Sequence, residues 1–158
     1  MGHFGFGYVG LAFLLLLFVP NLFWLKNKPE GYDPSGESRV LSILERVGEI
    51  GVTCTAVVFT DCNLRPWSPW SLWLVAAAGA MALYEVWWLR YFRSPHRMED
   101  FYRSLLGVPV AGATLPVAAF LLLGIYGRFV WLLLFAAILG VGHIGIHLRH
   151  RAALPSEA

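Results

Sequence analysis

Apolar residues along this chain come in five long runs separated by short polar segments. The runs cover about residues 5–25, 39–61, 69–92, 105–125 and 128–148. A hydrocarbon layer about 30 Å thick requires about 20 apolar residues in a helix, and each run reaches that length. The pattern therefore predicts an all-α polytopic membrane bundle of five transmembrane helices, which forms a single transmembrane domain over residues 1–158.

Basic residues alternate between the loops in step with these five runs. Cytoplasmic loops carry the excess of Lys and Arg. The second and fourth loops hold one basic residue each, and the first loop, third loop and C-terminal tail, with their flanks, hold Lys26, Lys28, Arg39, Arg46, Arg90, Arg93, Arg97, Arg103, Arg149 and Arg151. This alternation predicts an N-terminus outside, a C-terminus in the cytoplasm, and a multi-pass protein of the bacterial cytoplasmic (inner) membrane.

Composition agrees with a membrane protein and excludes several other classes. The chain is 58% hydrophobic and 14% charged, whereas soluble domains carry about 25% charged residues. A net charge of +2 does not indicate a nucleic-acid partner. Cys54 and Cys62 match no zinc or redox spacing. The expected partners are the lipid bilayer and other copies of the chain in a homo-oligomer, with no nucleic acid, and the cofactor stays unknown.

The second run differs from the others because ionisable residues lie inside it. Glu45 and Glu49 share one helical stripe, and Arg46 lies one turn from Glu49 and can pair with it. Two other runs also contain ionisable residues, which are Glu85, His143 and His147. With the basic residues as surface markers, Glu45 and His143 lie about 9 Å deep, Glu85 about 12 Å and Glu49 about 15 Å. We therefore predict an intramembrane polar cluster of Glu45, Arg46, Glu49, Glu85, His143 and His147.

Three interpretations of this cluster stay open. Charge in hydrocarbon costs about 2.5–3.5 kcal/mol or more, so the carboxylates must be protonated, paired, hydrated or metal-bound. They can form a structural clasp that holds the helices together, or a proton or substrate pathway. They can also form a transition-metal site, because His143 and His147 at i, i+4 spacing lie on one helix face and can bind metal with Glu45 and Glu85.

Small residues indicate how the helices pack. Ala136 and Gly140 form a row that leads to His143, and Ala78 and Ala82 form a row that leads to Glu85. Membrane helices approach closely through such residues. We expect both rows to face neighbouring helices, with Leu139 facing lipid or a looser contact.

Five segments carry a resemblance to other proteins: Pro20-Asn21 with Lys26-Asn27-Lys28-Pro29, Ile43-Leu44-Glu45-Arg46, Tyr84-Glu85 with Arg90-Tyr91-Phe92, the run from Gly107 to Pro116, and Gly142-His143-Ile144-Gly145-Ile146-His147. They resemble a group of small uncharacterised bacterial multi-pass membrane proteins, and this resemblance implies no activity. Size and helix count are also similar to isoprenylcysteine-methyltransferase-like enzymes. Their Arg-His-Pro cofactor motif is absent, because residues 93–96 read Arg-Ser-Pro-His.

The function hypotheses follow from the cluster and its depth. The first is small-solute or proton-linked transport that uses a cytoplasmic-side Glu/His cluster. The second is a membrane-embedded enzyme acting on a lipid or lipid-like substrate, and the third is an accessory or structural subunit of a membrane complex. The outer halves of the predicted helices are almost wholly apolar, which counts against a channel formed by one chain. No residue is assigned a catalytic role. Because transport is ranked first, the sequence favours a protein that is not an enzyme.

Overall fold

The computed structural model describes residues 2–154, which contain six α-helices and no β-strand. The helices are α1 (Tyr8–Trp24), α2 (Arg39–Val58), α3 (Leu72–Phe92), α4 (Met98–Tyr102), α5 (Ala111–Gly127) and α6 (Val130–Ala152), with a 3₁₀ turn, η1 (Pro69–Ser71), directly before α3. The predicted all-α class is confirmed.

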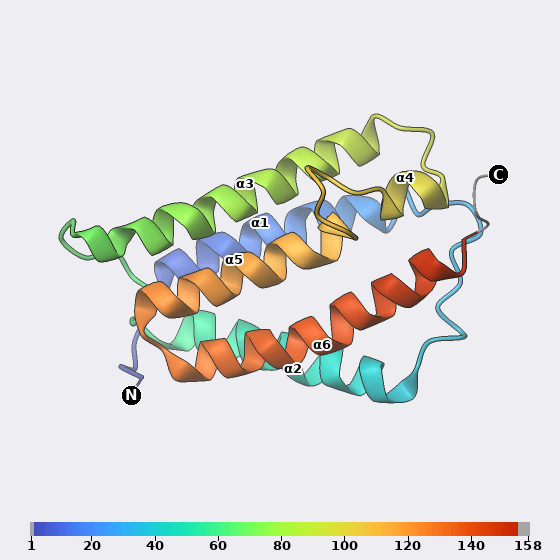
Figure 1. Cartoon of the computed structure of the whole chain (residues 1–158). Helices are drawn as coiled ribbons and strands as arrows, with labels where there is room; N and C mark the ends of the chain where they lie inside the picture. The colour runs from blue at the N-terminus through green and yellow to red at the C-terminus, as the bar shows by residue number, and fades with distance from the viewer. Residues whose placement is uncertain (1, 155–158) are drawn as a thin grey trace.

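The long helices form a closed ring. Each runs antiparallel to the long helix before it, and short α4 lies at one end of the bundle (Figure 1). Around the ring, α1 contacts α2, α2 contacts α6, α6 contacts α5, α5 contacts α3, and α3 returns to α1. The pairs α2–α6 and α3–α5 pack most extensively, and α1 touches its two neighbours least. We call the end that holds residues 25–38, α4 and the C-terminal part of α6 the α4 end.

Helix bounds differ from the predicted ones where the backbone turns sharply. Helix α5 begins at Ala111 rather than near residue 105, because residues 105–110 form a turn with positive φ at Leu106, Gly107 and Val110. Glycine tolerates such a conformation, and a proline nearby disfavours helix. Helix α4 was not predicted, since five residues are too few for a periodic pattern.

Glycines set the closest helix contacts. A Cβ atom on Gly142 of α6 would lie 2.3 Å from the backbone nitrogen of Glu45 in α2, so only glycine fits there. Gly140 faces α5 instead, where a Cβ would lie 3.0 Å from Val117 Cγ1. Leu139 is buried beside Gly48 of α2, so the expectation that it faces lipid or a looser contact is wrong.

The outer surface of the ring is largely apolar. Large apolar side chains are exposed on every long helix except the buried α5, for example Phe23, Ile50, Leu89 and Val141. The stretches Pro69–Phe92 and Val130–Ala152 are long and apolar enough to cross a membrane. Helices α1 and α5 are apolar but have 17 residues each. Helix α2 carries four charged residues, all in its N-terminal part.

Candidate functional site

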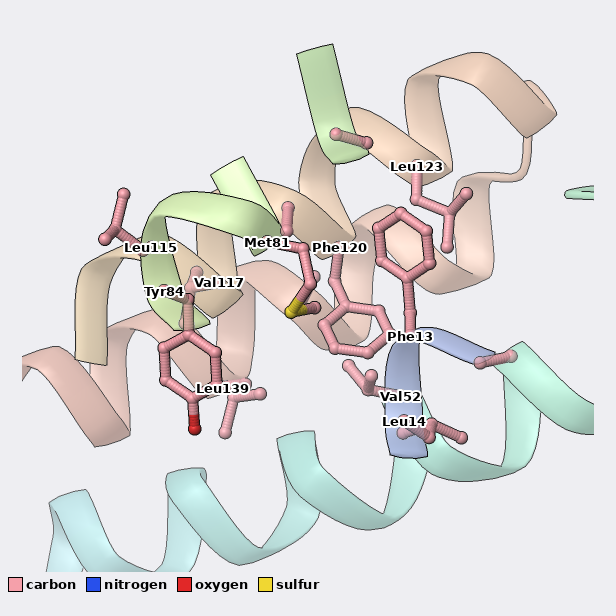
Figure 2. Close-up of a cluster of buried hydrophobic side chains, with 14 of the residues drawn as sticks. Phe13, Leu14, Val52, Met81, Tyr84, Leu115, Val117, Phe120, Leu123 and Leu139 are labelled. Carbon is pink, nitrogen blue, oxygen red and sulfur yellow. The ribbon is translucent and has the colours of Figure 1, made fainter. Parts of the chain in front are cut away.

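A cavity of about 430 Å³ lies inside the helix ring, toward the α4 end. Side chains from all five long helices line it, together with Phe101 of α4 and residues of the 25–38 loop. Phe120 closes the far side of the cavity, where its ring packs edge-on against Phe13 at a centroid distance of 6.1 Å. Figure 2 shows Phe120 and Phe13 among other buried side chains, including Leu14, Val52 and Leu123. The cavity is therefore one-sided: it lies in the α4 half of the ring and is closed toward the opposite end.

The Glu45–His143 pair lies on the cavity wall formed by α2 and α6. The glycine contact at Gly142 brings the two helices together at this level, and the neighbouring side chains meet. His143 Nδ1 lies 2.5 Å from Glu45 Oε1. The side chains are 29% and 28% exposed, so the pair is half-buried and reachable from the cavity. A carboxylate that binds one imidazole nitrogen orients the ring and leaves Nε2 available for proton exchange.

His147 lies next to this pair and also lines the cavity. Its ring centroid is 4.5 Å from that of His143, and it packs against Phe101 and Tyr102 of α4 at 5.8 and 5.7 Å. The i, i+4 spacing therefore places both rings on one face, as the sequence indicated.

Glu49 and Arg46 do not pair. Glu49 lines the cavity about one turn beyond Glu45, and its side chain is exposed. Arg46 is exposed and lies outside the cavity lining. Within residues 2–154 the ion pairs all involve histidine, so Glu49 has no cationic partner there. The Arg46–Glu49 pair that their one-turn spacing allows is therefore not formed among residues 2–154.

Glu85 does not join the cluster. The row Ala78–Ala82–Glu85 faces outward, since both alanines are exposed and Glu85 lines a separate outer groove between α1 and α3. One residue away, Tyr84 faces the cavity instead. A step of one residue turns the helix by about 100°, so this register separates Glu85 from Glu45 and His143.

Asn21 and Tyr84 form a polar contact on the opposite wall. Asn21 Nδ2 donates to Tyr84 Oη at 2.9 Å and to the Leu17 carbonyl at 2.7 Å. Both residues line the cavity, and sequence reasoning missed them as site residues. An asparagine inside an otherwise apolar helix is a polar signal of the same kind as Glu45, and it was available in the sequence.

The 25–38 loop covers the α4 end of the cavity. Glu37 Oε1 lies 3.1 Å from His150 Nε2 on α6, and the Tyr32 ring stacks on the His150 ring at 5.7 Å. Burial, together with the nearby Glu37 and Glu45 carboxylates, raises the pKa of Tyr32 to about 12. Tyr32 therefore stays neutral at physiological pH. No role was predicted for His150.

The mouth of the cavity opens sideways between α1 and α2. Leu22 and Leu25 line the cavity and are 64% and 58% exposed, and Glu49 of α2, which is also exposed, lines the same cavity. The two helices approach most closely at the other end, where a Cβ on Gly10 would lie 2.1 Å from the Ala56 carbonyl oxygen. They diverge from there toward the α4 end.

The arrangement fits proton exchange and apolar binding better than metal binding. Within residues 2–154, no three His, Cys, Asp or Glu side chains converge in a geometry that could hold a metal ion. The proposed ligand set of Glu45, Glu85, His143 and His147 is split, because Glu85 lies in the outer groove.

No family model, curated protein or solved structure matches this chain, so the resemblance to small bacterial membrane proteins stays a prediction.

Proposed function

We propose that this chain spans the bacterial cytoplasmic membrane with its five long helices and binds an amphiphilic small molecule in its one-sided cavity. Binding is linked to a proton on the Glu45–His143 pair, as in proton-linked transport of small solutes. The observation that carries the proposal is this pair on the wall of a mainly apolar cavity that opens at one half of the molecule.

Two features support the membrane assignment. Exposed apolar side chains cover the outer faces of α1, α2, α3 and α6, and soluble monomers rarely expose apolar surface on that scale. Ten of the twelve Lys and Arg residues belong to the loops and flanks of the α4 end, and Arg65 and Arg128 belong to the other. The positive-inside rule then puts the α4 end, and the cavity mouth near it, on the cytoplasmic side.

Reporter fusions test this topology. Fusions after Leu64 and Tyr126 should report an extracytoplasmic position, and fusions after Lys28, His96 and Arg149 a cytoplasmic one. A cytoplasmic signal at Leu64 would exclude the five-span topology.

Cysteine labelling gives an independent test of membrane embedding. Cys54 is exposed on α2, so a polar maleimide should modify it rapidly if water surrounds the helix. If lipid covers it, Cys54 should stay unlabelled in intact membranes and react after denaturation in SDS. A Ser35→Cys variant in the exposed 25–38 loop is the positive control, and rapid labelling of Cys54 in membranes would contradict the assignment.

Proton linkage can be tested without the natural solute. N-phenyl-1-naphthylamine is a neutral amphiphile, and energy transfer from the tryptophans that line the cavity reports its binding to the protein. We expect its binding to change the number of protons on the protein, measured with a pH indicator in weak buffer. Glu45→Gln should bind the probe without the proton change, and Glu99→Gln, exposed on α4, should behave as wild type. Absence of probe binding would overturn the proposed function.

A second candidate function is catalysis on a lipid-like substrate, and the same pair favours it. A carboxylate-oriented imidazole is a competent general base. The described cavity lining contains no Ser, Thr, Cys or Lys, so covalent catalysis by these residues has no candidate nucleophile. Conversion of membrane lipids by the purified protein, lost in His143→Gln, would favour an enzyme over a carrier.

A further inference from the structure

Apart from the histidines, the charged side chains that line the cavity are all carboxylates. Three carboxylates line the cavity, from Glu37, Glu45 and Glu49, and no Lys or Arg does. Glu37 and Glu45 are each paired with a histidine, which offsets a charge only when the imidazole is protonated. Glu49 has no ion-pair partner among residues 2–154. A bound cation would meet at least one uncompensated carboxylate, and a bound anion would be repelled by it.

Aromatic rings form much of the remaining wall, with contributions from Trp24, Trp87, Trp88 and Phe101. The indole Nε1 atoms of the three tryptophans are buried and have no hydrogen-bond partner. The indole rings therefore present carbon atoms to the cavity. These rings supply apolar surface, and a tryptophan face also attracts a cation where one lies over it, as at Trp24. At the edge of the site, Lys28 Nζ already lies 5.3 Å from the centroid of the Trp24 ring.

We propose that the ligand of the cavity is an organic cation with an apolar body, such as an alkyl or aryl ammonium or phosphonium ion. Glu49 is its counter-ion at the mouth, and the aromatic wall takes its apolar groups. This inference rests on the proposed function and names its ligand class. A small hydrated metal cation does not fit, because the aromatic wall cannot replace its water ligands.

Two ions of the same shape and opposite charge test the inference. Tetraphenylphosphonium and tetraphenylborate differ in the sign of their charge, so their relative affinity reports charge selection by the cavity. We expect the purified wild-type protein in lipid nanodiscs to bind the phosphonium about tenfold or more tightly than the borate, the size of one desolvated cation contact. Empty nanodiscs give the background partitioning of each ion.

Variants at Glu49 separate its charge from its structural role. Glu49→Gln should lose most of the preference for the phosphonium, and Glu49→Lys should reverse it. Glu99→Gln makes the same charge change on exposed α4 and should keep wild-type selectivity. Circular dichroism and the melting temperature establish that each variant is folded.

The two proposals fail in different ways. Equal affinity for the two ions, or an unchanged preference in folded Glu49→Gln, overturns the cation inference and leaves amphiphile binding intact. Failure to bind the phosphonium while the neutral naphthylamine still binds has the same meaning. Failure to bind the naphthylamine overturns the proposed function, and failure to bind all three probes overturns both proposals.

Discussion

The two ends of the helix ring differ in how their polar groups are satisfied. At the end opposite α4, His3 bonds Asp61 through its backbone nitrogen and Nδ1, at 2.6 and 2.8 Å. Trp70 Nε1 donates to the Tyr126 carbonyl at 3.0 Å, and Cys62 Sγ lies 3.6 Å from the Leu123 carbonyl oxygen. Polar groups at this end close the bundle and leave little chemistry available to a ligand.

At the α4 end, buried polar atoms lack protein partners. Among the described residues, the unpartnered atoms all belong to this half of the molecule, in Trp24, Glu85, Trp87, Trp88, His96 and Tyr102. Buried polar groups without partners cost about 1–3 kcal/mol each, so a fold retains them where a bound molecule, water or function compensates. Polar groups are thus satisfied at one end of the five long helices and left unpaired at the other, which is the end where we propose that a ligand binds.

The largest expected effect comes from breaking the closed half at α1. Gly10→Ala places a Cβ against the Ala56 carbonyl, a backbone atom that cannot rotate away. We expect a loss of about 3 kcal/mol, seen as a lower melting temperature in detergent. Gly79→Ala is the matched control, because nothing lies within 4 Å of a Cβ there, and it should gain up to about 1 kcal/mol. Equal melting temperatures would show that α1 does not seal this end.

The His3–Asp61 contact should stabilise the closed half in a pH-dependent way. Burial works against ionisation of Asp61, but the hydrogen bonds from His3 outweigh it and hold the pKa below its ordinary value of 3.8. A lowered pKa means that the stabilisation is fully present above about pH 4 to 5 and is lost as the pH falls through the folded-state pKa.

Asp61→Asn should therefore cost about 2 kcal/mol at neutral pH, and this cost should shrink as the pH falls below about 4. Melting temperatures of both proteins across this range measure the difference, with Glu99→Gln as a control for charge. A difference that persists unchanged at low pH would contradict the assigned role of the carboxylate.

In the cavity half, the Glu45–His143 pair should matter less for stability. Glu45→Leu removes the partner of His143, but the pair is half-buried, so we expect a cost of about 1–2 kcal/mol. Glu45→Gln keeps a hydrogen-bond acceptor and should melt close to wild type. If Glu45→Leu were as costly as Gly10→Ala, the pair would be mainly a structural clasp.

The smallest expected effect is at Glu85, and its sign is opposite. Its Oε1 atom is buried without a partner in the outer groove between α1 and α3. Glu85→Leu removes this unpaired group from an apolar surface, so we expect a gain of about 1 kcal/mol and unchanged ligand binding. A clear loss of stability or binding would mean that Glu85 has a partner or belongs to the site.

The sequence predicted the helices better than it predicted which residues face inward. The predicted bounds of 69–92 agree with η1 and α3 taken together, because Pro69 begins the segment and the apolar run ends at Phe92. Helix α3 is apolar on all sides, so its periodicity did not distinguish the face of Tyr84 from that of Glu85. Helix α2 is clearly amphipathic, and the cavity side of Glu45 and Glu49 could be read from its stripe.

Contacts between distant segments could not be predicted in this way. The meeting of Glu37 with His150 depends on how the 25–38 loop folds over α6, and no local pattern encodes that path. The close α2–α6 contact at Glu45 depends on Gly142 rather than Gly140, and the two glycines are equally small in the sequence. Only the position of the partner helix distinguishes them.

The sideways mouth between α1 and α2 has a consequence for how affinity would be measured. If bilayer surrounds the ring, Leu22 and Leu25 border on lipid, and an amphiphile reaches Glu49 by diffusing within one leaflet. The concentration that governs occupancy is then moles of ligand per mole of lipid. Adding empty vesicles at a fixed total ligand concentration would dilute the ligand in the membrane and raise the apparent Kd, even though no contact in the site has changed.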